Sequence, residues 1–255
     1  MKISCSTNLL ASAGAENLNQ AIDIAAELGF DGINIDATNT DFFSVDNFSF
    51  LNSAKIVRYA IKNKIEIHSL SVDSLNSNKT KNEIKRLNKT VSVAHALACP
   101  LVTFSTSLLD EKENIINQYK KNIEIIKKTS KLAEDFDICF AVEAAVNTVT
   151  DDFPKLLQLF VDVDEHNFGV VLNSLSFNKI NEKQAENDID LIDESLLLVK
   201  ITGEEETIAM NNILNKLSER GDSLYICDCK YTTAENLKKE LLNFIKFIKS
   251  IKSKK

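Results

Sequence analysis

Several residue types that dominate other classes of protein are scarce in this chain. Among its 255 residues there are six glycines, two prolines and no tryptophan. Tight hairpins depend on glycine and proline, so their scarcity disfavours an all-β fold. No run of about 18 apolar residues occurs, which excludes a transmembrane helix of ordinary length. Hydrophobic residues make up 44% and charged residues 26%, which are the proportions of a globular protein.

An excess of positive charge is also lacking. Thirty basic and thirty-seven acidic residues give a formal net charge of −7. This balance disfavours nucleic acid and anionic membranes as partners. The lysine-rich stretch 246–255 is interpreted as a solvated helix end, where positive side chains suit the negative end of the helix dipole.

The five cysteines are odd in number and fit no disulfide framework. Cys227 and Cys229 are two residues apart, but no second Cys/His pair completes a zinc site. We interpret all five as free, mostly buried thiols. The first residues are too polar for the apolar part of a signal peptide, so we expect an intact N-terminus and a cytoplasmic protein.

Short β-type runs alternate with long amphipathic stretches along the whole chain. A helix beginning after Asn17 and ending at Gly29 has a plausible cap at each end. Further helices are predicted over 53–63, 81–98, 111–135, 152–160, 182–193 and 234–251. Strands are predicted over 2–7, 32–36, 65–72, 101–106, 138–144, 168–173, 196–201 and 223–228.

Two of these helices have apolar faces that can be named from the sequence. The last helix is expected to bury Leu237, Leu241, Phe244, Ile245 and Ile248. In the long helix over 111–135, the apolar face predicted by helical spacing consists of Ile115, Ile116, Tyr119, Ile123, Ile126 and Leu132.

The strand starts lie about 27 to 37 residues apart. Strict alternation of strands and helices implies a parallel sheet with right-handed crossovers. Eight such units in about 250 residues are the size of a (β/α)8 barrel, also called a TIM barrel. A doubly wound open sheet is the alternative, but no glycine-rich turn follows the first strand, where a dinucleotide would bind. We predict a single TIM-barrel domain over residues 1–255.

Several of the predicted apolar strands end with an isolated polar residue. Glu143, Asn173, Lys200 and Asp228 end the runs of the predicted strands five to eight. The active site of a TIM barrel lies at these carboxyl ends of the strands. Burying one charge in such a strand is costly, whereas opposite charges that meet compensate one another. Four residues on strands two to four have comparable positions: Asn34, Asp36, His68 and Ser105.

The stretch ENLNQAIDIAAELGFDGINID resembles the opening of the xylose isomerase-like barrels, the sugar phosphate isomerase/epimerase family. This resemblance implies a TIM barrel and a divalent metal with four ligands. The ligands in the family are Glu on strand five, Asp on six, His on seven and Glu on eight. Two of those carboxylates flank the substrate and move protons at neighbouring carbons.

The family's ligand pattern is only partly kept. Glu143 matches the strand-five Glu, and Asp228 stands for the strand-eight Glu with one methylene less. Asn173 stands where the family has Asp, and Lys200 where it has His. A lysine ammonium has no lone pair to offer a metal. The resemblance therefore implies a degenerate site: Glu143, Asn173 and Asp228 are the possible ligands, and binding of Mn²⁺ or Mg²⁺ is weakened by the changes.

The leading hypothesis is an isomerase or epimerase of a small sugar, polyol or keto acid. Glu143 and Asp228 would exchange protons, while Lys200 or a weakly held divalent ion would stabilise the enediolate oxygen. Asn34, His68, Ser105 and Asn173 would contact the substrate.

Two alternatives stay open. The barrel could be non-catalytic and bind a small molecule or a partner protein, or it could be a metal-independent lyase that uses Lys200 as a Schiff-base former. In each case we expect a small, sugar-like ligand. A homo-oligomer is compatible with the family resemblance.

Overall fold

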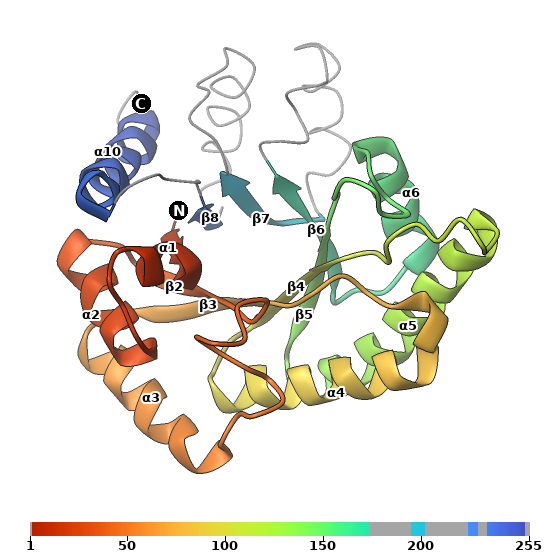
Figure 1. The fold of residues 1–255 in the computed structure, drawn as a ribbon, viewed down its shortest axis with the longest axis horizontal. Coiled ribbons are helices and arrows are strands. Elements are labelled where there is room, and N and C mark those ends of the chain that lie inside the picture. Colours follow the sequence, from red (N-terminus) through yellow and green to blue (C-terminus); the bar gives the residue numbers. More distant parts are fainter. Residues whose placement is uncertain (1, 174–194, 202–223, 229–233, 253–255) are drawn as a thin grey trace.

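The computed structural model describes residues 2–173, 195–201, 224–228 and 234–252. Eight parallel strands close into a barrel in the order β1 to β8, with β1 also pairing β8 (Figure 1). The TIM barrel is therefore confirmed, and the open sheet is wrong. The strands are β1 (Lys2–Ser6), β2 (Gly32–Asp36), β3 (Glu66–Ser71), β4 (Leu101–Ser105), β5 (Cys139–Glu143), β6 (Phe168–Asn173), β7 (Leu196–Ile201) and β8 (Leu224–Cys227).

The described helices lie on the outside of the barrel, each after a strand (Figure 1). The longer helices agree with the predicted spans to within a few residues, whereas α1 and η1 were not predicted. The helix predicted over 182–193 lies outside the described residues. The helices are α1 (Thr7–Ser12), α2 (Leu18–Leu28), α3 (Phe50–Lys62), η1 (Ser77–Lys79), α4 (Thr80–Ala96), α5 (Ile115–Glu134), α6 (Phe153–Val163) and α10 (Ala234–Lys252).

Local sequence signals explain where α2 begins and ends. The side chain of Asn17 accepts a hydrogen bond from the backbone N–H of Gln20, 3.1 Å away. Gly29 follows the helix with φ +85°, a conformation that glycine adopts without steric cost. Both caps were predicted, and they fix the point at which the chain turns into β2.

The hydrophobic core has two parts. A large cluster lies between the strands and the surrounding helices, and it includes the five predicted residues of α10. A smaller cluster of alternate strand residues lies apart from it: Leu101, Ala141, Val171, Leu198 and Ile226. Because successive strand residues point to opposite faces, this smaller cluster fills the inside of the barrel along β4 to β8.

The inside of the barrel is polar on the side of β2 to β4. The amide of Asn34 donates to the hydroxyl oxygens of Ser69, 2.6 Å away, and Ser71, 3.0 Å away. Ser71 in turn shares a hydrogen bond of 2.7 Å with Thr103. The three strands are thus joined by side chains as well as by their backbones. The pairing of β2 with β3 shifts its register between Ile33 and Asn34, which places Asn34 opposite Ser69.

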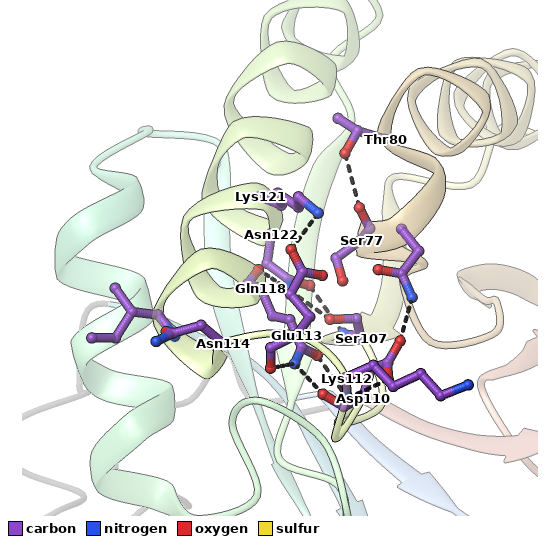
Figure 2. Close-up of polar contacts among 12 residues, drawn as sticks. Ser77, Thr80, Ser107, Asp110, Lys112, Glu113, Asn114, Gln118, Lys121 and Asn122 are labelled. Atoms are coloured by element: carbon purple, nitrogen blue, oxygen red, sulfur yellow. Dashed lines mark hydrogen bonds and ion pairs between the residues drawn. The ribbon is translucent and has the colours of Figure 1, made fainter.

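The apolar face predicted for α5 is partly wrong. Ile115 and Ile116 are 48% and 58% exposed, whereas Gln118 and Asn122 are buried. Figure 2 shows these two side chains between α5 and the loop that joins β4 to α5. Asn122 accepts from the backbone N–H of Ser107 and donates to its hydroxyl, at 2.9 and 2.8 Å. Buried amides are useful here because the loop's backbone groups need partners away from water.

Disulfides are not formed by the four described cysteines, in agreement with the sequence. Cys5, Cys99 and Cys227 are buried and Cys139 is partly buried, while Cys229 lies outside the described residues. Burial raises the pKa of the Cys99 thiol to about 12. None of the described helices combines the length and apolar character needed to cross a membrane.

Candidate functional site

Three charged side chains from different strands meet inside the carboxyl end of the barrel. The Nζ of Lys200 on β7 lies 3.0 Å from Oδ2 of Asp228, just after β8, and 3.6 Å from Oε2 of Glu143 on β5. Strands β5 and β7 are not neighbours, because β6 lies between them. Their side chains meet only by pointing into the barrel. Lys200 therefore points into the barrel.

Asn173 on β6 completes this cluster. Its amide nitrogen donates to Oε2 of Glu143 over 3.3 Å. The side chains of Lys200, Glu143 and Asp228 are 17%, 23% and 19% exposed, so all three are largely withdrawn from water. The four polar residues that end strands five to eight in the sequence thus form one group, here called the charged cluster.

The carboxylates keep Lys200 positively charged. Burial acts to lower the pKa of Lys200, since it disfavours the charged form. The negative charges of Glu143 and Asp228, with the hydrogen bond to Asp228, outweigh burial and raise that pKa above its ordinary value. Lys200 is therefore an ammonium ion and a hydrogen-bond donor at neutral pH.

Two further residues at this end of the barrel are Asp36, at the end of β2, and Asn8, in α1. The amide of Asn8 donates to Oδ2 of Asp36 over 2.7 Å. Thr38 donates to Oδ1 of Asp36 from its backbone N–H and its hydroxyl, at 3.0 and 2.6 Å. The charge of Asp36 also raises the pKa of Lys200. The position of Asp36 at a strand end was visible in the sequence, but Asn8 carried no signal.

Two predicted substrate contacts lie on the polar side of the barrel. Asn34 is buried and bonded to Ser69 and Ser71. Ser105, at the end of β4, shares a hydrogen bond of 2.7 Å with Ser74. Ser74 also lines a cavity of about 610 Å³ between the loops that follow β3 and β4. Ser105 is itself buried and reaches this cavity only through Ser74, and the polar atoms of Asn34 are engaged by its neighbours.

His68 is not brought to the charged cluster. It lies early in β3, where Ser4 Oγ bonds to its Nδ1 and Glu66 Oε2 lies 3.0 Å from its Nε2. Glu66 begins β3, so this group belongs to the amino end of the barrel. A Cβ added to Gly32 would overlap the imidazole, so the ring of His68 occupies the space left by the missing side chain. Burial lowers the pKa of His68 and favours its neutral form.

The described residues do not fit a divalent metal. The ammonium of Lys200 lies between the two carboxylates that would be ligands, and Asn173 turns its NH₂ group toward Glu143. A cation repels a metal ion and offers it no lone pair. Within 2–173, 195–201, 224–228 and 234–252, no three His, Cys, Asp or Glu side chains are grouped to hold a metal.

The chain belongs to the xylose isomerase-like TIM barrel family, whose model matches residues 22–248. This confirms the resemblance seen in the sequence. The comparison with curated proteins finds no match.

Solved structures of sugar epimerases and of a dehydratase share the fold. D-Psicose 3-epimerase from Clostridium cellulolyticum H10, crystallised with D-tagatose, has a TM-score of 0.78 and 14% identity over 99% of each chain. A probable 3-DHS dehydratase from Bacillus anthracis has a TM-score of 0.78 and 14% identity, over 96% of this chain and 99% of its own. The zinc-bound IOLI protein has a TM-score of 0.77 and 17% identity, over 100% and 99%. Identities this low establish the fold alone.

Proposed function

We propose that the chain is an isomerase or epimerase of a small sugar or keto acid, in which a lysine takes the place of the family's metal. The observation that carries this proposal is the ammonium of Lys200 held between Glu143 and Asp228 at 3.6 and 3.0 Å. Two carboxylates and one fixed cation at a barrel mouth are the groups that proton transfer next to a carbonyl requires.

The chemistry follows from these roles. One carboxylate takes a proton from the carbon beside the substrate's carbonyl, and the electron pair of that C–H bond moves into an enediolate. The ammonium of Lys200 stabilises the negative oxygen that forms. The carboxyl group that took the proton returns it to the neighbouring carbon, with a proton shift between the two enediol oxygens, and the product is an isomer. For an epimer, the other carboxylate takes up a proton from water and delivers it to the opposite face, while the first group releases its proton to water. No atom is gained or lost, so the product is an epimer or an isomer.

The polar side of the barrel suits the rest of such a substrate. Ser105 and Asn173 offer hydrogen bonds near the charged cluster, and Asn34 anchors the hydroxyl network behind them. The apolar cluster along β4 to β8 closes the barrel below. The site therefore combines a few directed polar groups with a closed floor, as small-molecule sites do.

The raised pKa of Lys200 argues against the lyase alternative. A Schiff base forms from a neutral amine, and amines that act in this way have lowered pKa values. The two carboxylates act in the opposite direction on Lys200. A non-catalytic barrel is the second candidate, because the same ion pairs neutralise the charges that catalysis would use.

Solvent exchange tests the proposal whichever product the reaction forms. The protein is incubated in D₂O, after treatment with a chelator, with a panel of free ketoses, and NMR follows deuterium incorporation beside the carbonyl. We expect incorporation with at least one ketose, and its loss in Glu143→Gln and Lys200→Met. Absence of exchange across the panel would contradict catalysis and favour a binding role.

The matched control is Glu165→Gln, which removes a carboxylate from the loop before β6, at the opposite end of the barrel. It should exchange deuterium as the wild type does. Exchange that vanishes with the chelator and returns with Mn²⁺ would contradict the replacement of the metal by Lys200.

A further inference from the structure

Asp36 is a buried carboxylate that the proposed proton transfer does not use. It is 8% exposed and accepts hydrogen bonds from Asn8 and from two groups of Thr38. Three donors are therefore directed at this one carboxylate, which is held in place at the end of β2, at the carboxyl end of the barrel.

Lys200 is already engaged by two carboxylates. A phosphate or carboxylate group of a ligand would have to compete with Asp228 at 3.0 Å and Glu143 at 3.6 Å for this ammonium. Asp36 adds a third negative charge, near enough to affect the titration of Lys200. The four charged side chains named here sum to a formal charge of −2, so an anionic ligand meets net repulsion.

The described loops around the mouth extend this negative field. The segments that join β2, β3, β4 and β5 to the next long helix carry two basic residues, Lys79 and Lys112. Helix lysines pair with some of their carboxylates, such as Lys89 with Asp46 over 3.1 Å, but acidic side chains stay in excess. The acidic residues of these loops are Asp41, Asp46, Asp73, Asp110, Glu111, Glu113, Asp151 and Asp152. An excess of one sign of charge, which the described segments carry here, focuses its field on an entering ligand.

We propose that Asp36 is a specificity-determining residue that excludes anionic ligands, so that the barrel takes an uncharged, polyhydroxylated compound and rejects its phosphorylated or carboxylated counterpart. This inference rests on the proposed function, because it assumes that a small hydroxylated ligand enters the mouth. It narrows that function from sugars and keto acids to neutral sugars.

The substitution Asp36→Asn isolates the charge from the hydrogen bonds. Thr38 can donate to the amide oxygen of the new side chain as it does to Oδ1. The amide oxygen of Asn8 is buried and has no hydrogen-bond partner among the described residues. By turning over, the amide of Asn8 can accept from the new NH₂ group and keep that contact. Removing the charge therefore need not disrupt the geometry.

The experiment measures binding of three free ketoses (D-fructose, D-tagatose and D-ribulose) and of their terminal phosphates by calorimetry, at low and at physiological salt. We expect the wild type to favour the free sugars. Asp36→Asn should reduce that preference roughly fivefold, because the variant loses the repulsion between one carboxylate charge and the two charges of a phosphate. Higher salt should weaken the wild-type preference and have less effect on the variant.

The matched control is Asp31→Asn, which removes the same charge just before β2, at the amino end of the barrel. It should leave the preference unchanged. Phosphates that bind the wild type as tightly as the free sugars would overturn the role of Asp36 but leave the proposed function standing. Failure of every ketose and phosphate to bind would overturn both. If a variant does not fold, the wild type still decides the question: the ratio of its affinities for free and phosphorylated sugar, and the change of that ratio with salt, test the repulsion directly.

Discussion

Replacing Lys200 by methionine removes the cation of the charged cluster and keeps a side chain of similar length. Glu143 and Asp228 then lie near one another, largely buried, without a compensating charge. Because they cannot relax fully into water, we expect the folded state to be destabilised at neutral pH. Methionine also suits an apolar neighbourhood, so lost packing contributes little to this effect.

The distances set the size of the effect. At an effective dielectric of about 20, the attraction of Lys200 to carboxylates at 3.0 and 3.6 Å is about 5 kcal/mol for each pair. Desolvation of the three charges offsets most of this, and removing one partner of a buried pair costs about 3–5 kcal/mol. Since the side chains retain 17% to 23% exposure, we expect a loss of about 3 kcal/mol in the free energy of unfolding.

Urea unfolding followed by circular dichroism at neutral pH measures this loss. The control is Lys155→Met, because Lys155 also contacts two carboxylates, Asp151 and Asp152, but is 49% exposed. Its loss should be below about 1 kcal/mol. Adding Asp228→Asn to Lys200→Met should restore part of the stability, and millimolar Mn²⁺ should stabilise the single variant but not the wild type. Equal unfolding midpoints for Lys200→Met and wild type would refute this account of the charged cluster.

Three further predictions concern the barrel itself. Burial lowers the pKa of His68 in the folded state, so the stability it contributes is complete above about pH 6.5 and is lost as pH falls below that value. His68→Gln should remove this part of the pH dependence of unfolding, whereas the exposed His166→Gln should keep it. Gly32→Ala should cost about 1–3 kcal/mol in urea unfolding, because its Cβ would overlap the ring of His68 and lie 2.6 Å from the carbonyl oxygen of Glu66. Asn122→Leu leaves the N–H of Ser107 without its partner; we expect a loss of about 1–3 kcal/mol and faster proteolysis in the loop before α5.

The barrel was predictable because its signals are local and repeated. Apolar strand runs, amphipathic helices and near-constant spacing fix the order of elements, and β2, β6 and β7 match their predicted bounds. The short α1 was missed, since six residues do not show a helical period. The face of α5 was partly wrong because Gln118 and Asn122 are buried to serve a neighbouring loop, and no periodicity announces such a role.

The sequence predicted which residues form the candidate site, but only partly how far along the barrel axis each of them lies. Alternation along each strand predicts which of its side chains point into the barrel. Glu143, Lys200 and Asp228 lie near the ends of their strands on inward positions, so the sequence could predict that they meet. Alternation does not show how far along the barrel a side chain lies. His68 therefore seemed comparable to Ser105, although it is bonded to Ser4 at the other end. The partners of Asp36 come from α1 and a turn, so they follow only from the folded chain.

The pairing of β1 with β8 sets an order of events for a chain growing on the ribosome. Cys5 faces Cys227 across this seam, which joins the first strand of the barrel to the last. At about 5–20 residues per second, synthesis of the intervening chain takes roughly 10–45 s. During that time β1 has one unpaired edge, a backbone surface open to any extended chain nearby. Ser4 and Ser6 make β1 polar, and a polar unpaired edge is less prone to aggregation.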